Sequence, residues 1–328
     1  MYVERPSLEA ALNNIFHSNE VRYLYGNSGS GKTWLYKSVF KRNDVYYYVI
    51  GLQELTEGTS FDDLIRHHLG YLGLRNESST TSAVAAELKV GGVGAAKAST
   101  TKSRPYEQRP LNLLLEGLRK FADERRAVLV LENVERGVRL PGILDELTKI
   151  IMSVDQESFS AYDVRVLFVG TVKDLVHRIS ELPDSAPILT RLDTLPEVTR
   201  LSEKEAKQLV ERGLFEVLQL EPVVDQSRLV GRVLQRTDRL PLHIHSYCLE
   251  IATAAVERGR NIDAPAEVTG FHNWVNRRVA QHVDRVFAHM NSKDTALKVR
   301  TRVLYCIGNG QLTEFRSLDV LNMLEREW

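Results

Sequence analysis

The feature that most constrains this chain is an eight-residue stretch at 26–33, which reads Gly-Asn-Ser-Gly-Ser-Gly-Lys-Thr. It matches the pattern G-x-x-x-x-G-K-[ST] without a mismatch, and it lies between an apolar run at 21–25 and a helical pattern at 34–41. Glycines let a backbone curl closely around a phosphate, and the N–H groups at the start of the next helix face its negative charge. The sequence therefore predicts a strand, a phosphate-binding loop and a helix in that order. The alternative is a Gly/Ser-rich turn that matches the pattern by chance.

Every residue of this loop is a candidate nucleotide contact, and so is the residue that follows it. Lys32 is placed to reach the β- and γ-phosphates of a nucleotide, and the hydroxyl of Thr33 is a candidate Mg²⁺ ligand. The sequence thus predicts ATP and Mg²⁺ as cofactors. The full set of candidates is Gly26, Asn27, Ser28, Gly29, Ser30, Gly31, Lys32, Thr33 and Trp34.

The composition is that of an ordinary globular protein and argues against several classes of partner. The 328 residues include 43 Lys and Arg and 43 Asp and Glu, so no overall charge favours nucleic acid or a membrane surface. The two cysteines form no Cys-x-x-Cys pair, which favours a reducing compartment. The sequence has no apolar stretch of membrane-spanning length and no signal-peptide pattern at its start. We therefore expect a cytoplasmic protein without a membrane partner.

Strands and helices alternate over the first part of the chain. Strands are predicted at 21–25, 45–50, 127–131 and 164–169, and a short strand at 197–201 is expected to close the sheet. This alternation predicts an α/β fold with a doubly wound parallel sheet. Beyond these strands the pattern is almost wholly helical.

Residues 76–104 differ in composition from their surroundings, because they are rich in Ser, Thr, Ala and Gly. A Gly-Gly pair at 91–92 separates two stretches of small residues, so a hairpin is one interpretation. A mobile surface insertion is the other, and the sequence leaves both open. Small, flat strands of this kind could gain order by pairing with a neighbouring subunit.

A second motif, at 128–133, reads Val-Leu-Val-Leu-Glu-Asn. A carboxylate at the end of a buried strand is the Walker B arrangement, and it predicts that Glu132 holds Mg²⁺ together with Thr33. Asn133 follows where a second carboxylate is usual in active ATPases; it can hydrogen-bond water but cannot accept its proton. Glu135 is the candidate to take that role. The alternative is a buried strand that simply ends in polar residues.

Three segments carry a resemblance to a known group of ATPases. Residues 3–9, Val-Glu-Arg-Pro-Ser-Leu-Glu, resemble the V-G-R-E-x-E-L opening of AAA+ and STAND ATPases, including the origin-initiator-like branch, although Glu4 and Pro6 depart from it. Residues 131–135, Leu-Glu-Asn-Val-Glu, are similar to the L-D-N-V-E form of Walker B in STAND switches. Residues 238–242, Asp-Arg-Leu-Pro-Leu, resemble the G-G-L-P-L turn of the helical lid in these families.

The resemblance covers about residues 2–260 and implies further nucleotide contacts. It implies that Val3 and Arg5 lie beside the adenine, and that Pro241 contacts the nucleotide from the lid.

The same resemblance implies catalytic roles outside the two main motifs. Phe-Val-Gly-Thr at 168–171 looks like a sensor-1 strand, so Thr171 is expected to contact the γ-phosphate or the attacking water. Arg191 lies where these families place an arginine finger that reaches a neighbouring subunit. The candidate catalytic residues are therefore Lys32, Glu132, Asn133, Glu135, Thr171 and Arg191.

Three regions follow from this resemblance. We expect a P-loop α/β ATPase domain at 1–201 that contains the insertion, a helical lid at 202–270, and a helical C-terminal region at 271–328. Helical patterns at 296–307 and 315–325 look like the first two helices of a winged helix, which is either abbreviated or cut short.

The function expected from these observations is an ATP-binding, slowly hydrolysing molecular switch or assembly ATPase. It is expected to form a homo-oligomer and to act on a partner protein, with a prokaryotic regulatory or anti-phage defence role resting on the family analogy. The rival is a DNA-acting initiator, loader or transposition helper of the same fold, against which the neutral charge and the missing recognition helix count. A P-loop kinase of a small metabolite fits the long helical C-terminal half poorly.

Overall fold

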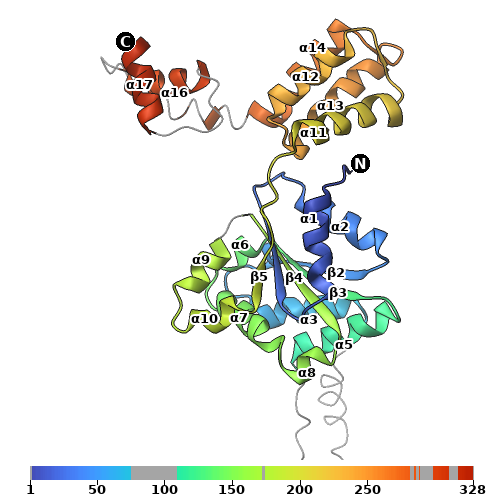
Figure 1. Cartoon of the computed structure of the whole chain (residues 1–328), viewed down its shortest axis with the longest axis vertical. Coiled ribbons are helices and arrows are strands. Elements are labelled where there is room, and N and C mark those ends of the chain that lie inside the picture. Colours follow the sequence, from blue (N-terminus) through green and yellow to red (C-terminus); the bar gives the residue numbers. More distant parts are fainter. Residues whose placement is uncertain are drawn as a thin grey trace, which may run out of the picture. The chain divides into compact units, whose positions relative to one another are not determined.

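The computed structural model describes residues 2–74, 109–171, 174–280, 284–285, 288, 298–309 and 317–327 (Figure 1). The chain forms two compact units. The first consists of Met1–Leu209 with Asp238–Leu242, and the second of Val210–Thr237 with His243–Trp328. The predicted insertion at 76–104 lies outside the described residues, so its two interpretations stay open.

The first unit is built on a parallel sheet of five strands in the order β2-β3-β4-β1-β5. The strands are β1 (Val21–Tyr25), β2 (Tyr46–Gly51), β3 (Ala127–Glu132), β4 (Val164–Gly170) and β5 (Leu192–Thr194). Helices lie on both faces of the sheet (Figure 1), which confirms the doubly wound α/β fold expected from the sequence.

Helices and short helical turns connect the strands of this unit. They are α1 (Pro6–Asn13), η1 (Asn14–Phe16), α2 (Lys32–Arg42), η2 (Leu52–Glu54), α3 (Phe61–Tyr71), α5 (Pro110–Ala122), α6 (Val134–Gly137), α7 (Ile143–Ser153), α8 (Glu157–Ser160), α9 (Asp174–Ser180) and α10 (Ser185–Leu189). Another helix, α11 (Glu203–Glu211), begins in this unit and ends in the next.

The sheet is buried on both faces because its side chains alternate between two apolar cores. Along β3, Val128 and Val130 pack with α1 and α2, whereas Leu129 and Leu131 pack with α3, α5 and α7. Successive side chains of a strand point to opposite faces, so an unbroken apolar run is the pattern that a sheet with two covered faces requires.

One predicted strand is wrong. The fifth strand is Leu192–Thr194 rather than 197–201. The chain beyond it stays beside β1, since Leu195 N–H donates to the Tyr23 carbonyl at 3.0 Å and Val198 N–H donates to the Tyr25 carbonyl at 2.9 Å. Pro196 lies between them and has no N–H to donate, so the regular ladder ends before it.

The second unit is mainly helical, as expected. Its elements are the π-helical turn η4 (Arg212–Val217), β6 (Glu221–Pro222), α12 (Gln226–Thr237), α13 (Pro241–Val256), β7 (Asn261–Ile262), α14 (Ala264–Trp274), the π-helical turn η5 (Val275–Val279), α16 (Val299–Asn309) and α17 (Ser317–Glu327). Its core centres on Tyr247, which is fully buried and stacks on Trp274 with ring centroids 5.0 Å apart. In the part of the chain that the structure describes, no helix is long and apolar enough to cross a membrane.

Candidate functional site

The glycine-rich loop connects the end of β1 to the start of α2, as the motif predicted, and two of its glycines are required by close approach. A Cβ atom on Gly26 would lie 2.2 Å from the backbone oxygen of Val198. A Cβ on Gly29, where φ is +79°, would lie 2.9 Å from the Cβ of Leu242. The loop is therefore held between the segment that follows β5 and the first residues of α13.

Lys32 and Thr33 are the first two residues of α2 and complete the loop motif. The Nζ of Lys32 donates to the carbonyl oxygens of Gly26 at 2.8 Å and of Asn27 at 3.0 Å. Burial lowers the pKa of Lys32, and the carboxylates of Glu135 and Glu132 act against that shift. Bound phosphates would favour the charged ammonium in the same way, and would replace the loop carbonyls as its partners.

Glu132 lies at the carboxyl end of β3 and meets α2 directly. Its Oε1 accepts a hydrogen bond from the Thr33 hydroxyl at 2.9 Å and another from the Tyr36 hydroxyl at 3.0 Å. The two residues that the motifs assigned to Mg²⁺ are thus brought together, although they are 99 positions apart in the chain. Tyr36 belongs to no motif, and sequence reasoning missed it.

Three strand ends line up beside the loop because β4 lies between β1 and β3. In the sheet register Glu132 is opposite Val169, and Gly170 is opposite Tyr25. Thr171 follows β4 at this edge, and its backbone N–H donates to the Oε2 of Glu135 at 3.1 Å. The structure therefore groups Glu132, Glu135 and Thr171 at the carboxyl edge that carries the loop.

Asn133 follows Glu132 in a left-handed conformation, with φ at +59°. Its Nδ2 donates to the Oε1 of Gln53 at 2.6 Å. Gln53 lies in η2, just after β2, and sequence reasoning missed it because no motif marks that turn. The Asn133 side chain is thus held by an amide partner from the neighbouring strand end.

The N-terminal segment joins the loop through Arg5. The guanidinium of Arg5 is buried; its NH1 donates to the Ser30 carbonyl at 3.4 Å, and its NH2 donates to the Thr199 carbonyl at 3.1 Å. Val3 is also buried. Arg5 thus links the loop to the segment after β5, whereas its expected contact with adenine stays a prediction.

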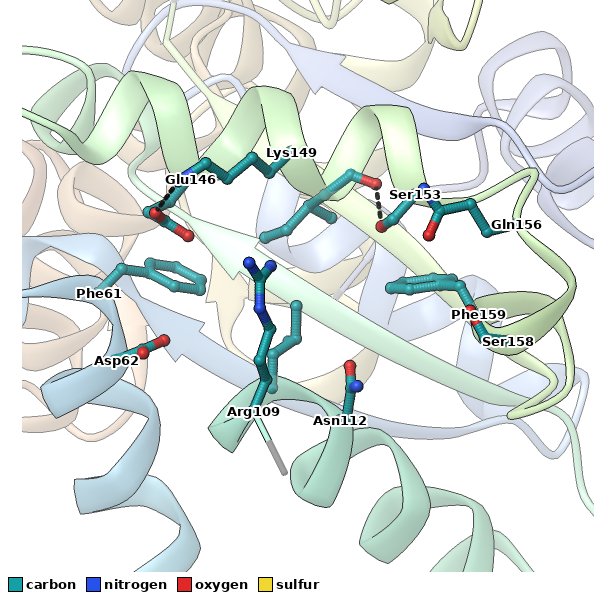
Figure 2. Close-up of a pocket in the computed structure, with 12 residues that line it drawn as sticks. Phe61, Asp62, Arg109, Asn112, Glu146, Lys149, Ser153, Gln156, Ser158 and Phe159 are labelled. Carbon is teal, nitrogen blue, oxygen red and sulfur yellow. Dashed lines mark hydrogen bonds and ion pairs between the residues drawn. The ribbon is translucent and has the colours of Figure 1, made fainter. Parts of the chain in front are cut away.

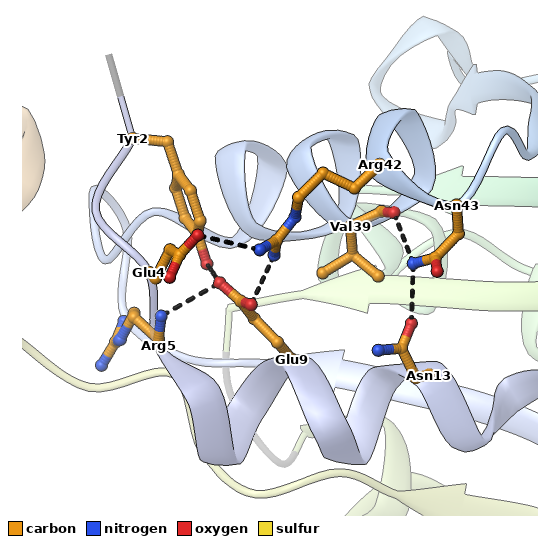
Figure 3. Close-up of polar contacts among 8 residues, drawn as sticks. All are labelled: Tyr2, Glu4, Arg5, Glu9, Asn13, Val39, Arg42 and Asn43. Carbon is orange, nitrogen blue, oxygen red and sulfur yellow. Dashed lines mark hydrogen bonds and ion pairs between the residues drawn. The ribbon is translucent and has the colours of Figure 1, made fainter.

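Glu9 holds this N-terminal segment in place (Figure 3). It accepts hydrogen bonds from the Tyr2 hydroxyl at 2.9 Å and the Arg5 backbone N–H at 3.0 Å, and it pairs with Arg42 at the end of α2. Burial opposes ionisation of Glu9, but the hydrogen bonds from Arg5, Arg42 and Tyr2 outweigh it and keep the pKa of this carboxyl below its usual value.

Residues 238–242, which resemble the lid motif, contact the glycine-rich loop. Pro241 faces Gly31, where a Cβ would lie 3.5 Å from the Pro241 Cγ. The Leu242 N–H donates to the Gly29 carbonyl at 3.2 Å. The Leu201 N–H donates to the Arg239 carbonyl at 3.1 Å, which ties this turn to the segment after β5. The structure thus places Pro241 beside the glycines of the loop.

The residues at this edge fit a nucleotide phosphate and its metal ion. Hydroxyl and carboxylate oxygens are the ligands that Mg²⁺ prefers, and Thr33 and Glu132 supply one of each. The hydroxyl of Ser30 is fully buried within the loop and has no hydrogen-bond partner among the described residues. Thr33 and Glu132 would hold Mg²⁺, which would supply positive charge beside the phosphates, and Lys32 and the N–H groups of the loop would hold the phosphates.

Comparison with known proteins identifies one domain of the chain. Residues 17–179 match the family described as an AAA domain. The chain therefore contains an AAA domain of the P-loop type. This confirms the AAA+ resemblance read from its motifs.

Solved structures with the same fold span nearly the whole chain. A Walker-type ATPase of Pyrococcus abyssi is 14% identical with a TM-score of 0.58, and the match covers 99% of this chain and 89% of that one. The Orc1 protein of Aeropyrum pernix, solved in complex with DNA, is 12% identical with a TM-score of 0.56, over 99% and 83% of the two chains. At these identities the likeness shows the fold. No curated protein matches the chain.

The side chains of two further candidates, Arg191 and Trp34, are in no identified contact with the glycine-rich loop among the residues that the structure describes. Arg191 pairs with Asp155, with the Nε 2.6 Å from the Oδ2, and its NH1 donates to the Pro187 carbonyl at 2.8 Å. Trp34 lies on the outer side of α2 with 53% of its surface exposed. Contact of either residue with a nucleotide stays a prediction.

The AAA domain also contains a cavity of about 450 Å³ away from the loop (Figure 2). Its lining combines aromatic rings, charges of both signs and amides, from the starts of α3 and α5 and from α7 and α8. In Figure 2 the guanidinium of Arg109 points between the rings of Phe61 and Phe159. The lining residues are Phe61, Asp62, Arg109, Leu111, Asn112, Glu146, Lys149, Ile150, Ser153, Gln156, Ser158 and Phe159. None of them belongs to the nucleotide-binding motifs.

Proposed function

We propose that this AAA-domain ATPase is a nucleotide-gated molecular switch or assembly ATPase of the AAA+/STAND type. The observation that supports this proposal is the place where α13 begins. Pro241 and Leu242 contact Gly31 and Gly29 within the first unit, and the rest of α13 belongs to the second unit. A nucleotide that rearranges the loop also displaces the start of this helix. Occupancy of the loop can therefore bias the arrangement of the second unit.

The loop has to rearrange when it binds phosphate. The Lys32 ammonium donates to the carbonyls of Gly26 and Asn27. Phosphate oxygens compete for the same three donors of the ammonium, so binding changes the contacts that hold the loop. A nucleotide-gated switch requires that nucleotide binding changes the contacts of the loop beside Pro241.

Hydrolysis is proposed to be slow because the site lacks an evident base next to Glu132. Asn133 cannot accept a proton and is already held by Gln53. Glu135 is the carboxylate best placed to orient water, since it accepts a hydrogen bond from Thr171 at the end of β4. Slow turnover suits a switch, because it prolongs the ATP-bound state.

The switch is proposed to work as a homo-oligomer on a partner protein, with Arg191 acting across the subunit boundary. A prokaryotic regulatory or anti-phage defence setting rests on the family analogy and on nothing in the site itself. The rival is a DNA-acting ATPase of the same fold; Arg277, in the second unit, has part of its charge balanced by Glu250 at 3.3 Å.

We expect ATP with Mg²⁺ to increase the molar mass of the protein in solution to a multiple of the monomer mass. We expect ATP, but not ADP, to favour a conformation that exposes the proposed interface between subunits. Multi-angle light scattering of the full chain with no nucleotide, with ADP and with ATP plus Mg²⁺ measures this. A constant mass in all three samples, in a protein that hydrolyses ATP, would contradict the assembly proposal. Binding to duplex DNA that weakens steeply with added salt would favour the DNA-acting rival.

Substitutions at the end of β3 should separate the metal ligand from the water-orienting residue. We expect Glu132→Gln to weaken Mg²⁺-dependent nucleotide binding and turnover together, because the metal bridges the phosphates. Asn133→Glu should raise turnover, because it supplies the missing base. Steady-state hydrolysis at several Mg²⁺ concentrations measures both effects. No change in Asn133→Glu, combined with a loss in Glu135→Gln, would assign the water-orienting role to Glu135.

A further inference from the structure

Tyr36 contacts the Walker B carboxylate although no motif includes it. Its hydroxyl donates to the Oε1 of Glu132 at 3.0 Å, and the Thr33 hydroxyl donates to the same oxygen at 2.9 Å. Thr33 and Tyr36 are three positions apart on α2, so both side chains lie on the face that meets β3.

The two oxygens of the Glu132 carboxylate have different partners, because both hydroxyl donors bind Oε1. Among the described residues, no hydrogen bond reaches the Oε2 of Glu132, so its lone pairs stay available to a metal ion or to metal-bound water. This arrangement leaves one oxygen of Glu132 for a metal ion while the other is held by the protein.

The Tyr36 ring is fixed by its surroundings. The side chain is fully buried in the core on the α1 and α2 side of the sheet. Its ring meets Phe40 at a centroid distance of 5.7 Å and the edge of Tyr47 at 6.0 Å. A ring packed in this way has little freedom, so the hydroxyl points at Glu132 before any ligand arrives.

We propose that Tyr36 is a positioning residue that holds Glu132 in the orientation needed to bind Mg²⁺. The proposal rests on the nucleotide-binding function proposed above. Partners that orient a metal ligand through a hydrogen bond are worth about 10- to 100-fold in metal affinity. Tyr36 thus sets how much Mg²⁺ the site needs, without itself touching the metal or the nucleotide.

The test is Tyr36→Phe, which keeps the ring in the core and removes only the hydroxyl. A fluorescent ATP analogue is bound to the full chain and titrated with Mg²⁺, and its affinity without Mg²⁺ is measured in parallel. We expect the Mg²⁺ concentration at half-maximal effect to rise by about tenfold or more, with the metal-free affinity unchanged. Tyr47→Phe is the matched control, because it removes a hydroxyl from the same aromatic cluster but not one bonded to Glu132.

Two outcomes overturn the proposal. The first is a Mg²⁺ dependence in Tyr36→Phe within twofold of the parent; if the melting temperature falls at the same time, a structural role alone is left. The second is an equal shift in Tyr47→Phe, which would assign the effect to the aromatic core. If the parent itself binds no nucleotide, the proposed function fails instead, so the two failures are distinguishable.

Discussion

Lys32→Ala is expected to abolish tight ATP binding while the protein stays folded. The Lys32 Nζ contacts two carbonyls of its own loop and no residue of either apolar core, so its removal costs little packing. Hydrogen bonds from a charged group are worth about 1.5 to 3 kcal/mol each. The loss of two such bonds to phosphates corresponds to about 100-fold or more in affinity. Isothermal titration calorimetry with ATP and Mg²⁺ measures the change.

The matched control is Lys37→Ala, which removes an exposed lysine from the same helix. It should bind ATP as the parent does, which would exclude a general effect of lost positive charge. Thermal unfolding without nucleotide should give nearly the same melting temperature for all three proteins. If the Lys32→Ala variant hydrolyses ATP at the parent rate, or if it is unfolded, the assignment of Lys32 as a phosphate-binding residue is wrong.

Arg191→Ala is expected to lower ATP turnover by a factor of about 10³ to 10⁵ if the residue acts as an arginine finger across a subunit boundary. In a single chain Arg191 pairs with Asp155, and that contact has to break before the side chain can reach a neighbour. The pair is partly exposed, and such pairs are worth about 0 to 1 kcal/mol. The free energy lost when this ion pair breaks is small compared with the stabilisation that an arginine finger gives to the transition state. Lys at this position should substitute poorly, because the planar guanidinium matches the spread charge of the transferred phosphoryl group.

The variant Asp155→Asn distinguishes two roles of Arg191, an arginine finger and a surface ion pair. If the ion pair is the whole role of Arg191, Asp155→Asn and Arg191→Ala should change the melting temperature alike and leave turnover alone. If Arg191 is a finger, only Arg191→Ala should lose turnover. Mixing Arg191→Ala chains with Lys32→Ala chains then tests the subunit boundary, since some interfaces join an intact loop to an intact arginine. Absence of recovered turnover in mixed oligomers that are shown to form would count against the finger.

Local patterns in the sequence were sufficient to predict most of the fold and the place of the glycine-rich loop between β1 and α2. The apolar runs of β1 to β4 and the glycine-rich loop each lie within a few consecutive residues, where the period of the side chains specifies the backbone. The strand predicted at 197–201 was wrong because a local sequence pattern does not show which backbone groups pair. The regular pairing with β1 ends before Pro196.

Contacts between distant parts of the chain were beyond sequence reasoning. Gln53 reaches Asn133 and Tyr36 reaches Glu132 only because the sheet brings β2, β3 and α2 together. The residue types alone carry no sign of these contacts, since a glutamine in a turn and a tyrosine in a helix have many uses. The pairing of Arg191 with Asp155 has the same origin.

The strand order has a consequence for how the protein is made. β1 carries the nucleotide-binding loop, but its sheet partners are β4 and β5, which lie about 140 residues or more further along the chain. At a synthesis rate of about 5 to 20 residues per second, β1 leaves the ribosome roughly 7 to 28 s before β4 does, and longer before β5. During that interval its apolar side chains and its unpaired backbone are exposed to chaperones and to other nascent chains. The ATP-binding loop is therefore among the first parts to be synthesised and among the last to acquire its final shape.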